Sequence, residues 1–291
     1  MGSGQAQQDI AEFARLSADA RYPALFRAAF PERAGAIDLA TITRIQEVVR
    51  NMPVAEKTNL VFIPGLLTDK RLFAPQVKAL ADIANCTVAD IDGADSIAEL
   101  AKSVLARAPH RFALAGFSMG CYIALEIMRQ ARERVQAVAL ISTSARPDTP
   151  EAIAARMAAM AQAEAHFQVV VDEIMPKFVH PSRMRYHSNV TTVYAMGLRV
   201  GKDAYLRQQR AIMGRIDSRP FLHQITCPTL VLCGRDDVIT PVAVHEELAA
   251  GIPGAELQIL KDSAHILTIG RPAAANKALR SWLGRVDPAT S

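Results

Sequence analysis

The sequence lacks several features that would assign it to particular classes of protein. Its 291 residues contain no run of five or more like charges, so the formal net charge of +4 is spread along the chain. We therefore expect no nucleic-acid partner and no binding to an anionic membrane surface. No stretch of eighteen or more apolar residues occurs either, which argues against a membrane-spanning helix.

Cysteine is scarce. The four cysteines include no C-x-x-C pair, and no histidine cluster lies beside them at metal-ligand spacing. Because free cysteine packs like a small apolar residue, buried core positions are the simplest interpretation of all four. The sequence also begins without the apolar run of a secretory signal. These absences favour a reduced, cytoplasmic setting and predict no metal site.

Short, β-rich apolar runs recur along the chain and predict buried parallel strands. The first run, Leu60 to Ile63, stops at the turn signal Pro64-Gly65. The other runs are Thr87 to Ile91, Phe112 to Phe117, Val135 to Ile141, Thr229 to Cys233 and Leu257 to Leu260. Helical patterns separate them, and the capping box Ser96-Ile97-Ala98-Glu99 opens one of these helices. The alternation predicts a mostly parallel sheet flanked by helices on both faces.

Two parts of the chain depart from this alternation and are predicted to be wholly helical. Residues 1–55 carry amphipathic helical patterns, which predict an N-terminal helical extension. Residues 146–220 show no strand signal; Thr149-Pro150 supplies a helix cap followed by proline, and His180-Pro181 breaks the pattern. We interpret 146–220 as a helical lid, inserted into an α/β core formed by residues 56–145 and 221–291.

The residues Gly116-Phe117-Ser118-Met119-Gly120 fit the pattern G-x-S-x-G. They stand at the end of a predicted strand and open a helical pattern. A sharp strand-to-helix turn strains the serine and exposes its hydroxyl above the sheet, and the flanking glycines give that turn room. The start of the helix also favours a developing negative charge. Ser118 is therefore the predicted nucleophile.

A serine nucleophile needs a base, and the base needs an orienting acid. Two late strands run into loops that carry such groups: Asp236-Asp237 follows one strand and His265 follows the last. This order of serine, acid and histidine suits a parallel sheet whose loops share one edge. His265 is therefore the predicted base. The other histidines follow no late strand and are interpreted as surface or lid residues: His110, His166, His180, His187, His223 and His245.

From about Asn59 to Leu283 the chain resembles the α/β-hydrolase superfamily. It is most similar to the lidded branch that holds carboxylesterases, enol-lactonases, proline iminopeptidase-like enzymes and carbon–carbon bond hydrolases. The acid loop of that branch commonly has glycine, two residues, aspartate, three residues and proline, which match Gly234, Asp237 and Pro241. The resemblance therefore implies that Asp237, rather than Asp236, is the acid.

The resemblance also implies an oxyanion hole made of two backbone N–H groups, those of Leu66 and Met119, and it implies no cofactor. The chain departs from the family in two places. Many relatives have His-Gly where this chain has Pro64-Gly65, so other contacts must hold that loop. Relatives usually open with a β-hairpin, whereas helices are predicted here; these could cover a sheet edge, pack on the lid or join copies in a homo-oligomer.

Together these features predict a serine hydrolase that cleaves a small, largely apolar carboxylic ester or lactone through an acyl-enzyme. The candidate substrate contacts are Phe117, Phe167, Val170, Ile174, Phe178 and His180, although simple helix packing would explain most of the lid residues. A carbon–carbon bond hydrolase, an amidase or peptidase, and an acyltransferase would use the same triad. A ligand-binding protein built on a hydrolase scaffold is the non-enzymatic alternative.

Overall fold

A computed structural model describes residues 57–184 and 187–286 of the chain. In these residues six parallel strands form one sheet in the order β2-β1-β3-β4-β5-β6. The strands are β1 (Thr58–Ile63), β2 (Ala84–Val88), β3 (Phe112–Phe117), β4 (Val135–Ile141), β5 (Thr229–Gly234) and β6 (Glu256–Leu260). The predicted extension of residues 1–55, with its oligomer contact, lies outside the described residues.

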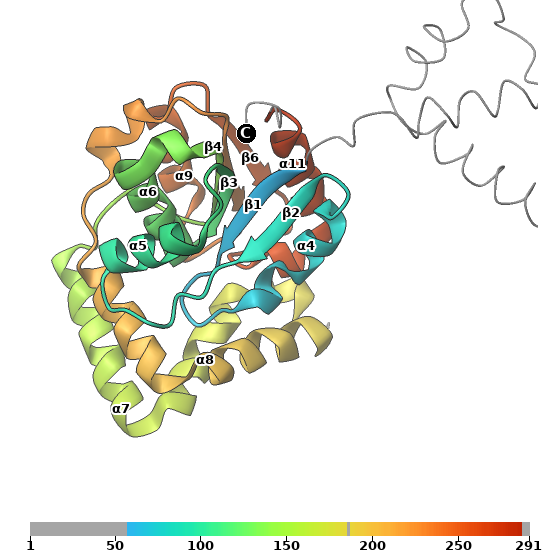
Figure 1. Ribbon diagram of the computed structural model, residues 1–291. Coiled ribbons are helices and arrows are strands. Elements are labelled where there is room, and N and C mark those ends of the chain that lie inside the picture. Colours follow the sequence, from blue (N-terminus) through green and yellow to red (C-terminus); the bar gives the residue numbers. More distant parts are fainter. Residues whose placement is uncertain (1–56, 185–186, 287–291) are drawn as a thin grey trace, which may run out of the picture. The chain divides into compact units, whose positions relative to one another are not determined.

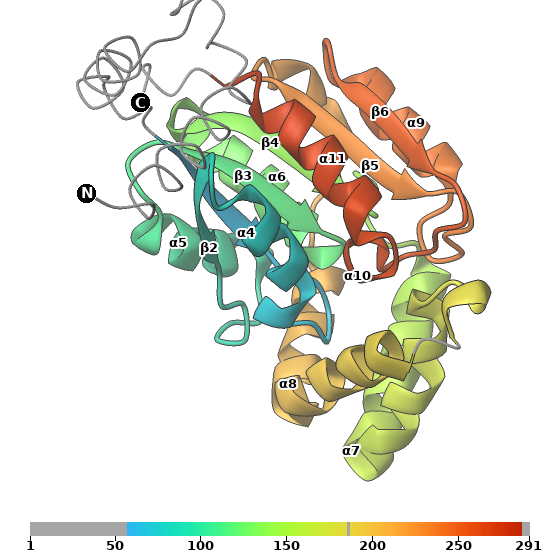
Figure 2. The same ribbon diagram turned by 90° about the vertical axis from the view of Figure 1, so that its right-hand side faces the viewer.

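Helices cover both faces of the sheet (Figures 1 and 2). One face carries α5 (Ile97–Arg107), α6 (Met119–Ala131) and α9 (Val242–Gly251), and the other carries α4 (Ala74–Leu80) and α11 (Pro272–Leu283). The short helices are η1 (Lys70–Phe73), η2 (Arg132–Arg134), η3 (Pro181–Arg183), η4 (Arg219–Gln224) and α10 (Leu267–Gly270). The predicted parallel sheet between two helical layers is therefore confirmed.

The continuous apolar strands follow from burial on both faces. Successive side chains of a strand point to opposite faces of the sheet. In β1, Leu60 and Phe62 accordingly belong to one hydrophobic core, and Val61 and Ile63 belong to the other. A strand buried on both sides has no polar face, so it appears in the sequence as a continuous apolar run.

The prediction for the second strand was shifted along the chain. Residues Thr87 to Ile91 were expected, whereas β2 spans Ala84–Val88. This strand lies at the edge of the sheet, and its side chains alternate in exposure, with Asn85 and Thr87 exposed. A search for continuous apolar runs misses a strand of this kind. Helix α5 begins at the predicted place, but the Ser96 side chain makes no capping hydrogen bond there.

Two long helices, α7 (Pro150–Phe178) and α8 (His187–Met213), connect β4 to β5. Figure 1 shows them at the end of the sheet toward which the strand arrows point. Thr149 caps α7 by accepting a hydrogen bond from Ala152 N, as its position predicted. Each helix is interrupted once by a non-helical residue, α7 at His166 and α8 at Gly201. Among the described residues no helix is long and apolar enough to cross a lipid bilayer.

Removal of the Trp282 side chain should lower stability more than removal of any other side chain in the core between the sheet and helices α4 and α11. Trp282 is fully buried in α11, and its indole N–H donates to the Pro228 carbonyl at 3.0 Å. We expect Trp282→Ala to lower the free energy of unfolding by about 3–5 kcal/mol, because a large cavity is left behind. Urea denaturation followed by circular dichroism measures this. The control is Val238→Ala, at a side chain that is 72% exposed, and an equal loss in both variants would contradict the assignment.

Candidate active site

Ser118 lies in the sharp turn between β3 and α6. Its backbone is in the left-handed region, with φ 51° and ψ −117°, and its N–H donates to the Ile141 carbonyl at 2.8 Å. A non-glycine residue in this conformation is strained and must be held by its surroundings. Gly120 makes the turn possible, because a Cβ at that position would lie 2.2 Å from the Ile63 carbonyl oxygen.

His265 lies between Ser118 and Asp237, although the three residues are far apart in the sequence. Its Nε2 is 2.9 Å from Ser118 Oγ, and its Nδ1 is 2.8 Å from Asp237 Oδ2. An ionised carboxylate can only accept, so Nδ1 carries the proton that it donates to Asp237. Nε2 is then free to accept the hydroxyl proton of Ser118.

Asp237 is held by a compact loop. Its Oδ1 accepts from the backbone N–H groups of Ile239 and Thr240 at 2.9 and 3.0 Å, and its Oδ2 accepts from the Thr240 hydroxyl at 2.7 Å. Burial by itself would raise the pKa of this carboxyl group. The His265 ring and the Thr240 hydrogen bonds outweigh it and lower the pKa below the ordinary value. Asp237 is therefore ionised at neutral pH.

The neighbouring carboxylate points elsewhere. Asp236 Oδ2 lies 3.3 Å from His180 Nε2, and the Asp236 side chain is 45% exposed. Of the two adjacent aspartates, Asp237 is therefore the one that the fold brings to His265.

The loop after β1 carries Leu66, and it is held from within by Thr68. The Thr68 hydroxyl accepts from Gly65 N at 2.8 Å and donates to the Gly65 carbonyl at 3.0 Å. These contacts hold the loop in place of those expected from the His-Gly of many relatives, which is Pro64-Gly65 here. Nothing in the sequence pattern had indicated Thr68. Leu66 lies in the loop after β1, next to Gly65, which packs against Ser118, and Met119 is the first residue of α6, directly after Ser118. In the described part of the chain, neither backbone N–H donates to another protein group.

This geometry agrees with comparisons to known proteins. Residues 60–278, most of the chain, match the alpha/beta hydrolase family. The chain belongs to this family. A protein of Klebsiella pneumoniae, provisionally named carbamate hydrolase RutD, is 26% identical over 65% of this hydrolase and 72% of its own length.

Two further relatives have names that specify a substrate. The pimeloyl-acyl-carrier-protein methyl ester esterase of Aliivibrio salmonicida is 24% identical over 72% of this chain and 86% of its own length. The solved structure of the enol-lactonase from Burkholderia xenovorans superposes with a TM-score of 0.72. It shares 26% identity and covers 79% of this chain and 92% of its own. Homology thus supports hydrolase activity.

His245 contradicts one prediction made from the sequence of this hydrolase. It was expected at the surface, but it is fully buried in α9. Its Nε2 accepts from Thr143 N at 2.8 Å, and its Nδ1 donates to the Pro241 carbonyl at 3.2 Å. The Thr143 hydroxyl in turn donates to the Ser118 carbonyl at 3.1 Å. His245 therefore joins the loop that carries Asp237 to the loop after β4, which contacts the Ser118 backbone. No local pattern in the sequence could indicate these contacts.

Two of the candidate substrate contacts flank the histidine. The rings of Phe117 and Phe178 lie 5.1 and 5.2 Å from the imidazole of His265, on different elements. Ile266 N also donates to the Phe178 carbonyl at 2.9 Å, which ties the end of α7 to the histidine loop. A buried imidazole between two aromatic rings has little room to turn away from Ser118.

The remaining candidates lie within or at the edge of α7. Phe167 packs on Tyr205 of α8, with ring centroids 5.9 Å apart. Val170 is fully buried and Ile174 is half-buried in the same hydrophobic core. His180 pairs with Asp236 and accepts from Ser182 N. Packing between the helices therefore accounts for Phe167 and Val170 without a contact to substrate, which was the alternative given for most of the lid residues. Among the described residues, no group of three His, Cys, Asp or Glu side chains is arranged to hold a metal.

His245 should make the stability of the protein depend on pH. Burial lowers the pKa of this histidine from 6.5 to about 4. Between these values the unfolded chain binds more protons than the folded one, so stability falls as the pH drops from 6.5 toward 4. The contribution of His245 to this loss reaches about 3 kcal/mol.

Urea denaturation across this pH range, in the wild type and in His245→Gln, measures that contribution. We expect a shallower pH dependence in the variant, because glutamine carries no titrating group. Parallel stability curves for the two proteins would contradict the assignment.

Proposed function

We propose that this hydrolase cleaves a small, largely apolar carboxylic ester or lactone through an acyl-enzyme on Ser118. One observation carries the proposal. Hydrogen bonds run from Ser118 Oγ to His265 Nε2 and from His265 Nδ1 to Asp237. A hydroxyl beside a base that is itself oriented by a carboxylate is arranged for nucleophilic attack on a carbonyl carbon.

The first half of the proposed reaction forms the acyl-enzyme. Ser118 Oγ attacks the carbonyl carbon while His265 Nε2 takes the hydroxyl proton. Asp237 stabilises the imidazolium without taking a proton itself, which agrees with its lowered pKa. The negative charge develops on the carbonyl oxygen, between the N–H groups of Leu66 and Met119. When the tetrahedral intermediate collapses, the C–O bond breaks and the leaving alcohol takes the proton from His265.

The second half repeats these steps with water. The water oxygen attacks the acyl carbon while His265 takes a proton from the water. The second intermediate collapses, Ser118 regains its proton, and the carboxylic acid leaves. Every proton moves through His265, so the reaction needs no group beyond those named.

An ester or lactone agrees with the names of two of the three relatives described above and with the surroundings of Ser118. The relatives include an esterase and an enol-lactonase, and both of their names specify a carboxylic ester bond. Three side chains close to His265 are apolar, and Phe117, Phe178 and Ile266 belong to one continuous hydrophobic core. An apolar acyl chain would be desolvated there without leaving polar groups unpaired.

We further propose that residues 146–220 act as a lid over Ser118. Helix α7 ends at Phe178, whose ring contacts His265 and whose carbonyl accepts from Ile266. The lid would therefore exclude water from the imidazole when substrate is bound. Exclusion of water strengthens the electrostatic interactions on which the proposed mechanism depends.

The variant Ser118→Ala tests the nucleophile. We expect the wild type to cleave p-nitrophenyl esters in a series from acetate to decanoate, and the alanine variant to lose at least about 10⁴-fold in kcat. The chain length that is cleaved best sizes the acyl pocket. If the folded wild type cleaves no member of the series, the ester proposal fails. The remaining alternatives would then be a narrow lactone, carbon–carbon or amide substrate, or a ligand-binding protein.

The adjacent aspartates provide a matched pair of variants for the acid. Asp237→Asn should lower kcat by about 10⁴-fold, because the amide favours the wrong imidazole tautomer. Asp236→Asn should leave kcat within about twofold, since the Asp236 carboxylate is exposed and faces His180. Equal losses in both variants would count against Asp237 as the acid. The same ester assay measures both.

A further inference from the structure

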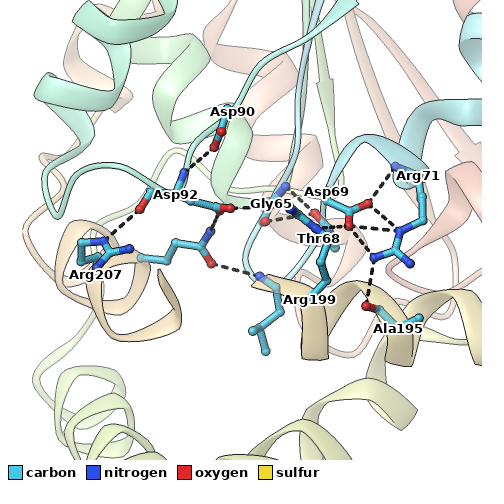
Figure 3. Close-up of polar contacts among 11 residues, drawn as sticks. Gly65, Thr68, Asp69, Arg71, Asp90, Asp92, Ala195, Arg199 and Arg207 are labelled. Carbon is cyan, nitrogen blue, oxygen red and sulfur yellow. Dashed lines mark hydrogen bonds and ion pairs between the residues drawn. The ribbon is translucent and has the colours of Figure 1, made fainter. Parts of the chain in front are cut away.

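The loop that carries Leu66 is held from outside by α8 as well as from within. Figure 3 shows side chains of α8 beside Asp69 of this loop and beside Asp92, which lies in the loop after β2. Arg199 Nε donates to Asp69 Oδ2 at 2.7 Å, and Arg71, which is also bound to Asp69, donates to the Ala195 carbonyl at 2.9 Å. The Asp69 carboxylate is almost completely buried. The first half of α8 therefore binds the loop at Asp69 and Arg71, on the C-terminal side of Leu66.

The second half of α8 reaches the loop closer to Leu66. Gln208 is fully buried, and its Oε1 accepts from the backbone N–H of Leu67 at 3.1 Å. Its Nε2 donates to Asp92 Oδ1 at 3.2 Å. A carboxylate can only accept, so Asp92 fixes which end of the Gln208 amide faces Leu67.

Gly201 lies between the two halves of α8 and interrupts the helix. Its φ of 79° and ψ of 170° are conformations open to glycine. The bend falls between Arg199 and Gln208, and both of these residues contact the loop.

Hydrogen bonds of Thr68 and Gln208 fix the orientation of the two peptide planes that flank the Leu66 Cα atom. The plane that carries the Leu66 N–H also carries the Gly65 carbonyl, which accepts from the Thr68 hydroxyl and from Thr68 N. The next plane carries the Leu67 N–H, which is bound by Gln208. A trans peptide is rigid, and its N–H and C=O point in opposite directions. Holding both planes therefore sets the backbone angles of Leu66 and the direction of its N–H.

We infer that Gln208 is a positioning residue for the oxyanion hole, acting through the Leu67 peptide to aim the Leu66 N–H. This inference rests on the proposed function, since it assigns a purpose to the Leu66 N–H in that reaction. Through Gln208, α8 holds the peptide next to the charge-stabilising donor. Loss of the Gln208 hydrogen bond would therefore be transmitted to the Leu66 N–H.

Gln208→Met is the primary variant, because methionine keeps the length of the side chain and removes both hydrogen bonds. Misaiming one oxyanion donor should lower kcat about 10- to 100-fold while KM stays within about threefold, since the donor acts chiefly in the transition state. Gln209→Met is the matched control. Gln209 is the next residue of α8 and is also buried, but it bonds Tyr205 and Arg156 and not the loop. The control should keep kcat within about twofold of the wild type.

A swap of chemical groups separates positioning from simple packing. Gln208→Glu keeps an acceptor for Leu67 N–H but places a second carboxylate against Asp92, so kcat should fall. Adding Asp92→Asn returns a donor to the pair and leaves the total charge as in the wild type. The double variant should therefore recover most of the kcat that Gln208→Glu loses. No recovery, or equal kcat losses in Gln208→Met and Gln209→Met, would overturn the inference.

Hydrogen exchange at the Leu67 amide gives a readout that does not require activity. We expect faster exchange in Gln208→Met than in the wild type, and no change in Gln209→Met. Unchanged exchange in Gln208→Met would overturn the inference whatever the kinetics. Labelling of wild-type Ser118 by a fluorophosphonate tests the proposed function separately. Faster exchange with an unlabelled, inactive wild type would refute the proposed function, and it would also remove the catalytic role inferred for Gln208.

Discussion

Close contact between the backbones of neighbouring strand ends is the constraint on which the site depends. The turn at Ser118 touches the end of β1 so closely that a Cβ on Gly120 would lie 2.2 Å from the Ile63 carbonyl oxygen. The acid loop meets the histidine loop in the same way, with a Cβ on Gly234 placed 2.3 Å from the Ser263 carbonyl oxygen. Both contacts bring loops of a parallel sheet together at its carboxyl edge, where three distant side chains can then reach one another.

Burial at this edge would be costly if its polar groups were not paired. Asp237 offsets its desolvation with hydrogen bonds from Thr240 and His265, and His245 stays neutral because burial lowers its pKa to about 4. Cys121 lies in the first turn of α6, and burial raises the pKa of its thiol to about 12, which disfavours the reactive thiolate close to Ser118. The Ser118 hydroxyl, in contrast, lies within hydrogen-bond distance of the His265 imidazole.

The connection between β4 and β5 contacts two of the loops at the carboxyl edge of the sheet. Its first helix ends against the imidazole through Phe178, and its second helix holds the loop after β1 through Arg199 and Gln208. The His265 imidazole and the loop that carries the proposed oxyanion donor thus both contact the same inserted segment. Under the proposed function, a substitution in these helices would alter the chemistry as well as any contact with substrate.

Most strands and the residues that meet at the edge were predictable because their signals are local. Doubly buried strands appear as apolar runs, and β3 and β4 begin and end where those runs do. The turn at Ser118 and the loops after β5 and β6 are short motifs that follow such strands. The edge strand β2 was misplaced for the complementary reason, since its exposed positions interrupt the apolar run.

Apolar runs and loop motifs in the sequence predicted the α/β class and the places of Ser118 and His265, and the family resemblance added the choice of Asp237 over Asp236. Only the tertiary structure decided which other residues support them. His245 and Gln208 meet partners 102 and 141 positions away, so no window of sequence contains both members of either contact. These residues are buried and hydrogen-bonded because helices pack against the sheet. The periodicity of the sequence does not indicate which distant residue a buried polar group will contact.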